Sequence, residues 1–184
     1  GATLPVEKRL DALKKLKTCI QKYEPLINEA LKRDLGKSNF ESYMCEVGLV
    51  LSELSYMIRH TPSYAKEKTV LTPLAQFASR SYKKPSPYGV VLVMSPWNYP
   101  FLLTIDPLID AIAAGNTVVL KPSAYSPHTS RVIETIITEC FDSQYVAVVN
   151  GGRAENNTLL NEHFDYIFFT GSQHVGREVM AKAS

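Results

Sequence analysis

Four short apolar runs in the second half of the chain constrain the fold more than any other feature. They lie at residues 90–94, 117–120, 146–149 and 166–169. Wholly apolar runs of this length are typical of parallel strands that are buried on both faces. The segments between them have helical character, and we expect helices over 101–114, 126–141 and 155–161. Strands that alternate with helices favour an α/β fold with a doubly wound, Rossmann-like parallel sheet.

The first 65 residues are predicted to form helices. One apolar stripe recurs at spacings of three and four residues, through Val6, Leu10, Leu13, Leu16 and Ile20. Because proline suits the first turn of a helix better than its interior, Pro25 predicts a break. We therefore expect one helix over 5–23, a second over 25–35 and a third over 39–60.

Residues 61–87 have a different texture. They contain four prolines, and apolar and polar residues partly alternate over 76–83. This pattern predicts an exposed strand or hairpin that reaches toward another subunit. The expected organisation is N-terminal helices over 1–65, a bridging arm over 66–87 and a Rossmann-like portion over 88–184.

Charge and cysteine content argue against several classes of protein. A net charge of +2 gives no reason to expect a nucleic-acid partner, and no apolar run approaches the length of a membrane span. Cys19, Cys45 and Cys140 are odd in number and lack a C-x-x-C spacing, which argues against a disulfide framework or a zinc site. The four histidines also lack the spacing of metal ligands, so we expect no metal. A reducing, cytoplasmic setting fits this cysteine usage.

Polar clusters follow three of the four apolar runs. They are Ser95-Pro96-Trp97-Asn98-Tyr99-Pro100, Lys121-Pro122-Ser123 and Gly171-Ser172-Gln173-His174-Val175-Gly176. In a doubly wound sheet, ligands bind beyond the carboxyl ends of the strands. The three clusters are therefore the candidate functional site.

Each cluster permits a functional and a structural interpretation. Asn98 sits in a loop fixed by two prolines and can donate to a developing oxyanion, or it can cap the next helix or satisfy the loop's own backbone. Lys121 can reach a ribose or phosphate, or it can simply close its strand and face solvent. Gly171 and Ser172 can bind an anion at a helix N-terminus, or Ser172 can act as a plain N-cap. The residues alone leave these alternatives open.

Together, the three clusters resemble the aldehyde dehydrogenase superfamily. The resemblance rests on Ser-Pro-Trp-Asn-Tyr-Pro-Phe at 95–101, Gly-Asn-Thr-Val-Val-Leu-Lys-Pro-Ser at 115–123 and Phe-Phe-Thr-Gly-Ser at 168–172. Glu46-Val47 and Tyr56-Met57-Ile58 in the N-terminal helices, with Val-Val-Asn-Gly-Gly at 148–152, are similar to its class 3 branch, which acts on fatty and aromatic aldehydes.

The resemblance implies NAD- or NADP-dependent oxidation of an aldehyde to a carboxylic acid. It assigns Asn98 to the oxyanion hole and Lys121 to the adenosine ribose. Ser172 would touch the pyrophosphate, with Gly171 and Gly176 shaping its turn. The other cofactor contacts that it implies are Ser95, Pro96, Trp97, Ser123 and Gly152. The segment at 66–86 is similar to the arm that bridges subunits, so we expect a homodimer of the complete enzyme.

Two departures from the family pattern matter. Ala124 stands where many NAD-preferring members have a glutamate that accepts hydrogen bonds from the ribose, which favours use of NADP or of both cofactors. The family's nucleophilic cysteine and general-base glutamate lie downstream of the Gly-Ser motif. We therefore expect this chain to be truncated before the catalytic domain and inactive alone. A non-catalytic NAD(P)- or partner-binding module, and a relative of the acyl phosphate reductases, are the alternatives.

Overall fold

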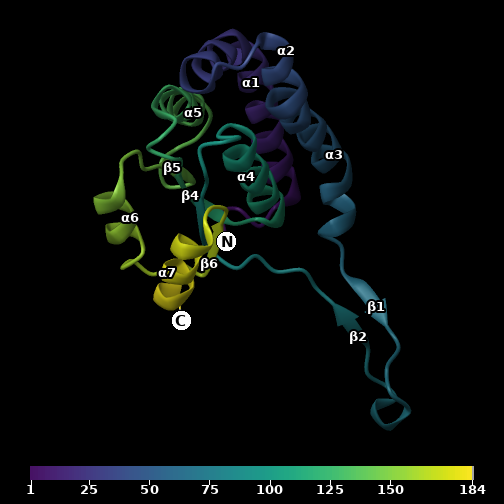
Figure 1. The fold of residues 1–184 in the computed structure, drawn as a ribbon. Coiled ribbons are helices and arrows are strands. Elements are labelled where there is room, and N and C mark those ends of the chain that lie inside the picture. The colour runs from purple at the N-terminus through teal and green to yellow at the C-terminus, as the bar shows by residue number, and fades with distance from the viewer. Residues whose placement is uncertain (184) are drawn as a thin grey trace.

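The computed structural model describes residues 1–183, so Ser184 of the predicted Rossmann-like portion lies outside the described part. A four-stranded parallel sheet forms its centre, with the strand order β5-β4-β3-β6 (Figure 1). The strands are β3 (Val90–Met94), β4 (Thr117–Lys121), β5 (Val146–Val148) and β6 (Tyr166–Phe169). They match the four apolar runs, which confirms the α/β fold with a parallel sheet.

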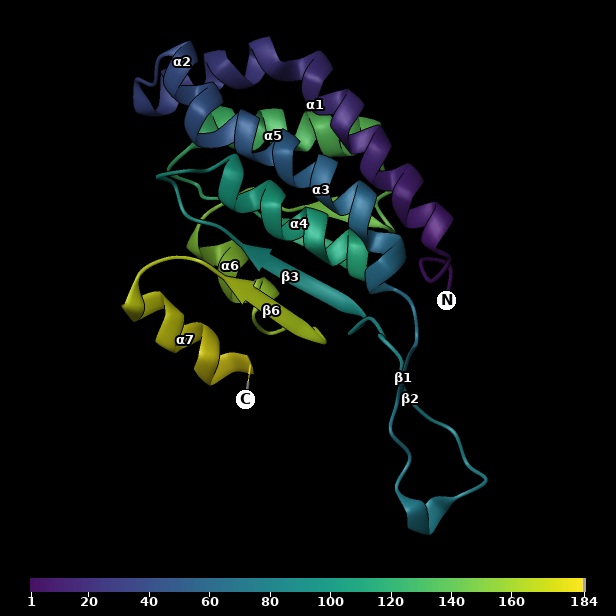
Figure 2. The same ribbon diagram turned by 90° about the vertical axis from the view of Figure 1, so that its right-hand side faces the viewer.

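Helices cover both faces of this sheet (Figure 2). On one face lie α4 (Leu102–Ala114) and α5 (Pro127–Cys140), with α1 (Val6–Leu35) and α3 (Gly48–Tyr64) packed outside them. On the other lie α6 (Arg153–Leu159) and α7 (Gln173–Ala183). Because successive side chains of a strand point to opposite faces, Val91 and Val93 enter the larger core, whereas Leu92 and Met94 join a smaller core with Val179 of α7.

Strand β6 is less buried than the apolar-run pattern predicts. It pairs only with β3 among the described strands, and it forms an edge of the sheet. Ile167 and Phe169 pack against the smaller core, but Tyr166 and Phe168 stay 43% and 38% exposed on the opposite face. No described helix covers these two rings, so the prediction of burial on both faces is wrong for this strand.

Helix α1 is one element and not the two that Pro25 predicts. The missing proline N–H removes a single hydrogen bond to the carbonyl four residues earlier. Leu13, Leu16 and Ile20 before the proline and Ile27 and Leu31 after it are all buried in the same core. Packing along the whole length therefore outweighs the local penalty, and the helix ends at Gly36, which adopts φ 70°.

The third predicted helix, over 39–60, is interrupted and longer than expected. It consists of α2 (Asn39–Ser42), a π-helical turn η1 (Tyr43–Val47) and α3, which runs on to Tyr64. Pro62 lies inside the last turn of α3, where buried Thr61 donates its hydroxyl to the Met57 carbonyl at 2.6 Å. The end predicted at residue 60 is therefore wrong.

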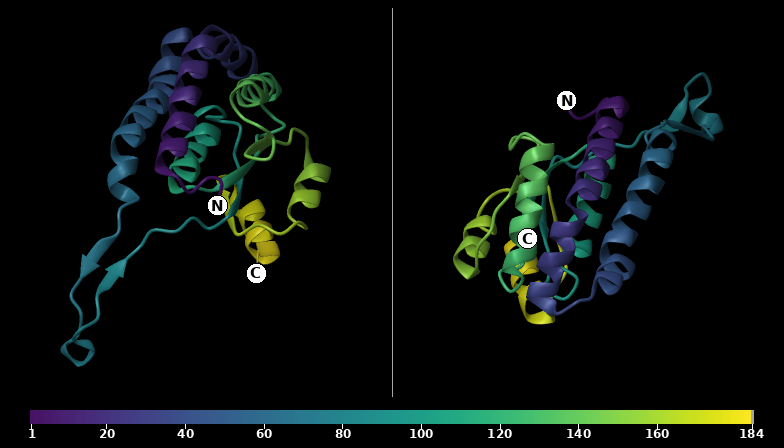
Figure 3. Two further views of the ribbon diagram at one scale, coloured as in Figure 1. Left: turned by 180° about the vertical axis from the view of Figure 1, so that it is seen from behind. Right: turned by 90° about the horizontal axis from the view of Figure 1, so that it is seen from above.

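The segment after α3 is a hairpin that projects away from the body of the molecule (Figure 3). Its strands are β1 (Lys68–Val70) and β2 (Ser81–Lys83), paired antiparallel, with a short 3-10 turn η2 (Leu74–Gln76) at the tip. The predicted hairpin is present, but the strand predicted over 76–83 covers only its last three residues. Ala78 breaks the strand there, because it adopts φ 74°.

Candidate cofactor cleft and oxyanion loop

The three polar clusters meet at the carboxyl edge of the sheet. Met94 at the end of β3 lies in register with Lys121 of β4 on one side and Phe169 of β6 on the other. The loops that follow these strands therefore begin side by side. Together they enclose a cleft of about 230 Å³. Its lining includes seven of the predicted site residues: Ser95, Pro96, Trp97, Lys121, Ser123, Gly171 and Ser172.

Lys121 does not face solvent, so the alternative of a solvated strand end is wrong. The residue is 3% exposed, and its Nζ donates to the carbonyls of Pro122 at 2.8 Å and Gly151 at 2.7 Å. An ammonium group carries three N–H bonds, so one is left to point at a ligand in the cleft. Burial lowers the pKa of Lys121, and the nearby carboxylate of Glu155 raises it.

Ser95 contributes a rigid wall to the cleft. Its hydroxyl lies 2.5 Å from that of Thr104, which in turn donates to the Pro100 carbonyl at 2.6 Å. Its backbone N–H donates to the carbonyl of Lys121 at 3.3 Å. These contacts tie the two ends of the loop at 95–100 together and join it to β4.

The Gly-Ser turn lies tightly against β6. A Cβ added to Gly171 would come within 2.6 Å of the Phe169 ring, and one added to Gly176 within 3.3 Å. Ser172 Oγ accepts a long hydrogen bond of 3.4 Å from the Val175 N–H. This is the contact expected if Ser172 serves as an N-cap. Gly176 itself is not part of the cleft lining, and it shapes the turn through its contact with Phe169.

Gly152 also lies outside the cleft lining. It is the N-cap of α6, and its N–H donates to the Glu155 carboxylate at 2.6 Å. Its neighbour Gly151, at φ 138°, supplies the carbonyl that accepts from Lys121. The two glycines therefore act on the cleft by fixing the position of the lysine.

A second and larger cavity adjoins the first. It has a volume of about 550 Å³, lies between α6 and α7, and shares Met94, Asn156 and Val175 with the first cavity. Val175 belongs to the predicted Gly-Ser cluster, whereas Asn156 was not predicted as a lining residue, because a polar residue in a short helix carries no distinctive pattern. The two cavities are adjacent at these shared residues.

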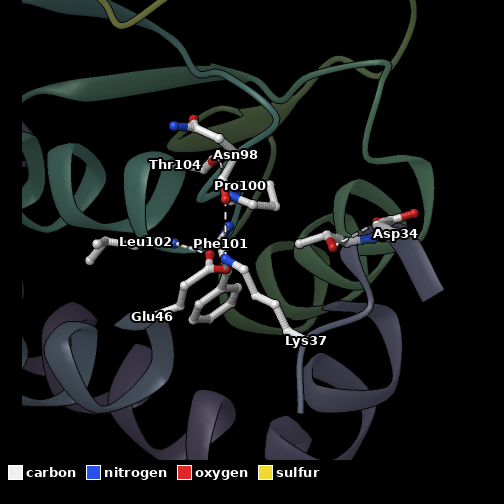
Figure 4. Close-up of polar contacts among 9 residues, drawn as sticks. Asp34, Lys37, Glu46, Asn98, Pro100, Phe101, Leu102 and Thr104 are labelled. Carbon is white, nitrogen blue, oxygen red and sulfur yellow. Dashed lines mark hydrogen bonds and ion pairs between the residues drawn. The ribbon is translucent and has the colours of Figure 1, made fainter. Parts of the chain in front are cut away.

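Asn98 lies outside both cavities, on the outer side of the loop. Its side chain is exposed, and within residues 1–183 the amide makes no hydrogen bond (Figure 4). The first turn of α4 is capped by Glu46, whose carboxylate accepts from the Phe101 and Leu102 N–H groups at 2.8 and 3.1 Å. Asn98 therefore neither caps this helix nor satisfies the loop's backbone, and its amide is available to a ligand.

Lys37 and Glu46 contact this loop, although neither was predicted to be a site residue. Their charged groups lie 2.5 Å apart, and their side chains are 8% and 0% exposed. A lysine after a helix-ending glycine and a glutamate on a helix are common surface residues. Glu46 stands out in the sequence only through the similarity of Glu46-Val47 to class 3 members. That similarity does not indicate that Lys37 and Glu46 contact residues 98–102.

None of the three thiols reaches the cleft. Cys19 and Cys140 are buried between α1 and α5, Cys45 lies on η1, and all three are free. Burial raises the pKa of the Cys140 thiol, and the adjacent Cys19 raises it further. Over residues 1–183, no three histidine, cysteine or acidic side chains gather as metal ligands, and no described helix combines the length and the hydrophobicity needed to cross a membrane.

Comparisons with known proteins agree with this geometry. The model of the aldehyde dehydrogenase family matches residues 2–184. The chain is 46% identical over 182 residues to 4,4'-diaponeurosporen-aldehyde dehydrogenase of Staphylococcus aureus (strain NCTC 8325 / PS 47), covering 99% of this chain and 40% of that protein. It is 42% identical over 184 residues to aldehyde dehydrogenase family 3 member B2 of Mus musculus, covering 100% of this chain and 38% of that protein.

A solved structure of the substrate-bound state of Staphylococcus aureus AldH has the same fold. It superposes with a TM-score of 0.97 at 46% identity and covers 98% of this chain and 40% of that one. The chain thus spans about 40% of the length of these relatives. By its family match, its relatives in aldehyde dehydrogenase family 3 and its strand-end loops, the chain belongs to the aldehyde dehydrogenase family.

Proposed function

We propose that this chain forms the NAD(P)-binding part of an enzyme that oxidises an aldehyde to a carboxylic acid. The observation that carries the proposal is the cleft at the carboxyl edge of the sheet, which unites the loops after β3, β4 and β6. Dinucleotides bind at this edge in doubly wound sheets. The alternative of a non-catalytic binding module explains the cleft but gives no role to the exposed amide of Asn98.

The residues of the cleft fit a dinucleotide. Lys121 supplies one free N–H for the adenosine ribose, and its charge favours the neighbouring phosphates. The turn at Gly171 and Ser172 precedes the N-terminus of α7, where backbone N–H groups attract an anion. The larger cavity between α6 and α7 combines Leu160 and Val175 with polar and charged side chains, and its volume of about 550 Å³ suits part of a dinucleotide. When bound, the nicotinamide accepts the hydride of the aldehyde.

Asn98 is the one catalytic donor that we assign within this chain. Its amide N–H projects from a loop that two prolines and the Ser95–Thr104 contact hold rigid, so it can stabilise the oxyanion formed by attack on a carbonyl. No described thiol lines the cleft, and we propose that the attacking thiolate lies outside these 184 residues. The 184-residue chain alone should therefore not oxidise aldehydes.

Ala124 bears on the choice between NAD and NADP. It is exposed between Ser123 and Tyr125, which both line the cleft. A glutamate at this position would repel the 2′-phosphate of NADP, and alanine does not. We propose that the enzyme uses NADP or both cofactors.

The hairpin and the free thiols suggest the setting of the protein. Leu71, Leu74 and Phe77 at the tip are 82–95% exposed, which suits a segment covered by a second subunit of a homodimer. Three free thiols, two of them buried, suit a reducing compartment such as the cytoplasm.

The test of the proposed function is cofactor binding. Lys121→Ala should weaken NADPH or NADH binding, followed by the fluorescence of the reduced nicotinamide, by about tenfold or more, because a charge-assisted hydrogen bond contributes about 1.5–3 kcal/mol. Lys121→Met keeps the side-chain volume and should give the same loss. Lys22→Ala, which removes an exposed lysine of α1 paired with Glu139, is the matched control. Unchanged affinity in both Lys121 variants would count against this site.

A further inference from the structure

The buried pair of Lys37 and Glu46 contacts the loop that carries Asn98 from below (Figure 4). Lys37 Nζ donates to the backbone carbonyl of Asn98 at 3.1 Å and lies 4.2 Å from the centroid of the Tyr99 ring. Glu46 Oε2 accepts from the backbone N–H groups of Phe101 and Leu102. One ion pair therefore holds both ends of the segment 98–102, more than fifty residues away in the sequence.

The bonding capacity of the lysine is fully used in this arrangement. One N–H donates to the Glu46 carboxylate and one to the Asn98 carbonyl. The charged group also lies over the face of the Tyr99 ring. A single ammonium group thus fixes two consecutive residues of the loop. The Asn98 side chain leaves the same residue in the opposite direction, toward the outside (Figure 4). A shift of the Asn98 carbonyl therefore moves the amide with it.

The local backbone aims Glu46 at the loop. Glu46 lies in the π-helical turn η1 between α2 and α3, and Lys37 directly follows the left-handed residue Gly36 that ends α1. A π-turn holds one residue more than an α-turn, so it rotates the side chains after it by about 100° relative to an unbroken α-helix. The left-handed glycine thus directly precedes Lys37, and the π-helical turn contains Glu46. These are the two residues that pair beneath the loop.

Helix capping alone does not explain the pair. Glu46 caps α4, whose own N-cap Phe101 has no side-chain bond to offer. The lysine compensates the buried charge of the Glu46 carboxylate, but two buried charges give little net stability compared with an apolar pair of similar volume. What the lysine adds is the contact with Asn98.

We infer that Lys37 and Glu46 are positioning residues that hold the Asn98 amide at the height and direction needed for oxyanion stabilisation. This inference rests on the proposed function. Because a displacement of about 1 Å can cost two orders of magnitude in rate, loosening the pair reduces turnover of the aldehyde although neither residue touches it. In this inference, the effect of the pair on turnover passes through the position of Asn98.

The experiment is a double-mutant cycle in the complete enzyme, with kcat measured at saturating NAD(P)+ and aldehyde. Lys37→Met and Glu46→Gln should each lower kcat by about tenfold to a hundredfold, less than the hundredfold to thousandfold loss of one whole oxyanion donor in Asn98→Ala. In the Asn98→Ala background, the same two changes should lower kcat by less than about threefold further, because the group that they position is gone. Lys37→Arg keeps the charge and should retain more activity than Lys37→Met.

Two readouts separate positioning from a general loss of structure. NAD(P)H affinity should stay within about twofold of the wild type, and hydrolysis of an activated ester without cofactor, which needs only the thiolate and the oxyanion donor, should fall in parallel with kcat. Ile136→Val is the control for stability, because Ile136 is fully buried on α5 and lines neither cavity. It should lower the melting temperature while leaving kcat unchanged.

The outcomes are distinguishable. If Asn98→Ala lowers kcat but Lys37→Met and Glu46→Gln do not, the inference is overturned and the proposed function stands. If their losses multiply with that of Asn98→Ala, the pair acts elsewhere and the inference also fails. If Asn98→Ala leaves kcat unchanged, the oxyanion role assigned under the proposed function is wrong, and the positioning role falls with it.

Discussion

Asp34 should contribute more to stability than its place in the last turn of α1 suggests. Its carboxylate accepts three hydrogen bonds at the start of α5, from His128 N at 3.2 Å, Thr129 N at 2.7 Å and Thr129 Oγ1 at 2.7 Å. The N-cap residue Ser126 makes no cap bond with its own side chain, and α5 has no acidic residue in its first turn. Asp34 alone therefore satisfies and neutralises this helix end.

The magnitude follows from these contacts. A lost N-cap costs about 0.5–2 kcal/mol and a lost hydrogen bond to a charged group about 1.5–3 kcal/mol. Because the three bonds share one half-buried carboxylate, we expect Asp34→Ala to cost about 2–3 kcal/mol. Asp34→Asn keeps one acceptor oxygen and should cost about 1 kcal/mol.

Equilibrium unfolding in urea measures both losses, and a thermal melt should show a decrease of about 5–10 °C for the alanine variant. Glu29→Ala is the matched control, since it removes an exposed i,i+4 partner of Arg33 on the same helix and should cost less than about 0.5 kcal/mol. A loss for Asp34→Ala no larger than that of Glu29→Ala would refute the capping argument.

Three further predictions concern pH, cofactor choice and assembly. Burial, helped by two neighbouring carboxylates, raises the pKa of Asp106 from 3.8 to about 6. The folded state therefore binds this proton more tightly, and the stabilisation present below pH 3.8 is lost as the pH rises through 6. Asp106→Asn should leave the free energy of unfolding unchanged below pH 3.8. At neutral pH it should raise the free energy of unfolding by about 1 kcal/mol, a value reduced for the partial exposure of Asp106. An effect independent of pH in urea titrations would contradict this. Ala124→Glu should lower kcat/KM for NADP+ relative to NAD+ by about tenfold in the complete enzyme, and an unchanged ratio would argue against a ribose contact here. If the complete enzyme forms the homodimer proposed above, Leu74→Glu combined with Phe77→Glu should convert it to a monomer in sedimentation velocity, and an unchanged mass would exclude the arm from the interface.

The sheet could be predicted from the sequence almost to the residue, because its signal is local. A wholly apolar run of four or five residues has few other uses in a chain of this length. The bounds of β3 and β6 match the predicted runs, and β4 extends only to include Lys121. The α/β order and the meeting of three strand-end clusters followed from general rules of sheet topology.

Helix boundaries were less predictable where long-range packing competes with local preference. Pro25 and Pro62 both indicate breaks, yet both lie inside helices. For Pro25 the decisive term is burial of the stripe on both sides of it, which depends on contacts with α5 and the sheet. The π-helical turn at 43–47 has no recognisable sequence pattern. Its role follows only from the contacts of Glu46 with Lys37 and with the backbone of Phe101 and Leu102.

The same reasoning explains what was missed at the site. Lys121 and Asn98 could be found because they sit directly beside a strand end, where position indicates function. Lys37 and Glu46 could not, because their importance lies in contacts with backbone groups of residues 98–102. Hydrogen bonds to backbone carry no side-chain pattern, so the supporting residues of a site are harder to find than the residues that touch a ligand.

The N-terminal helices are part of the site's construction for this reason. Asp34 caps α5, which follows β4, and Glu46 caps α4, which follows β3. Both caps come from the thirteen residues 34–46, which run from the last turn of α1 into η1, and α1 shares its core with Val91 and Val93 of the sheet. The loops of Lys121 and Asn98 both end at these two helix starts. The segment 34–46 therefore supports the starts of the helices that follow both the cofactor loop and the oxyanion loop.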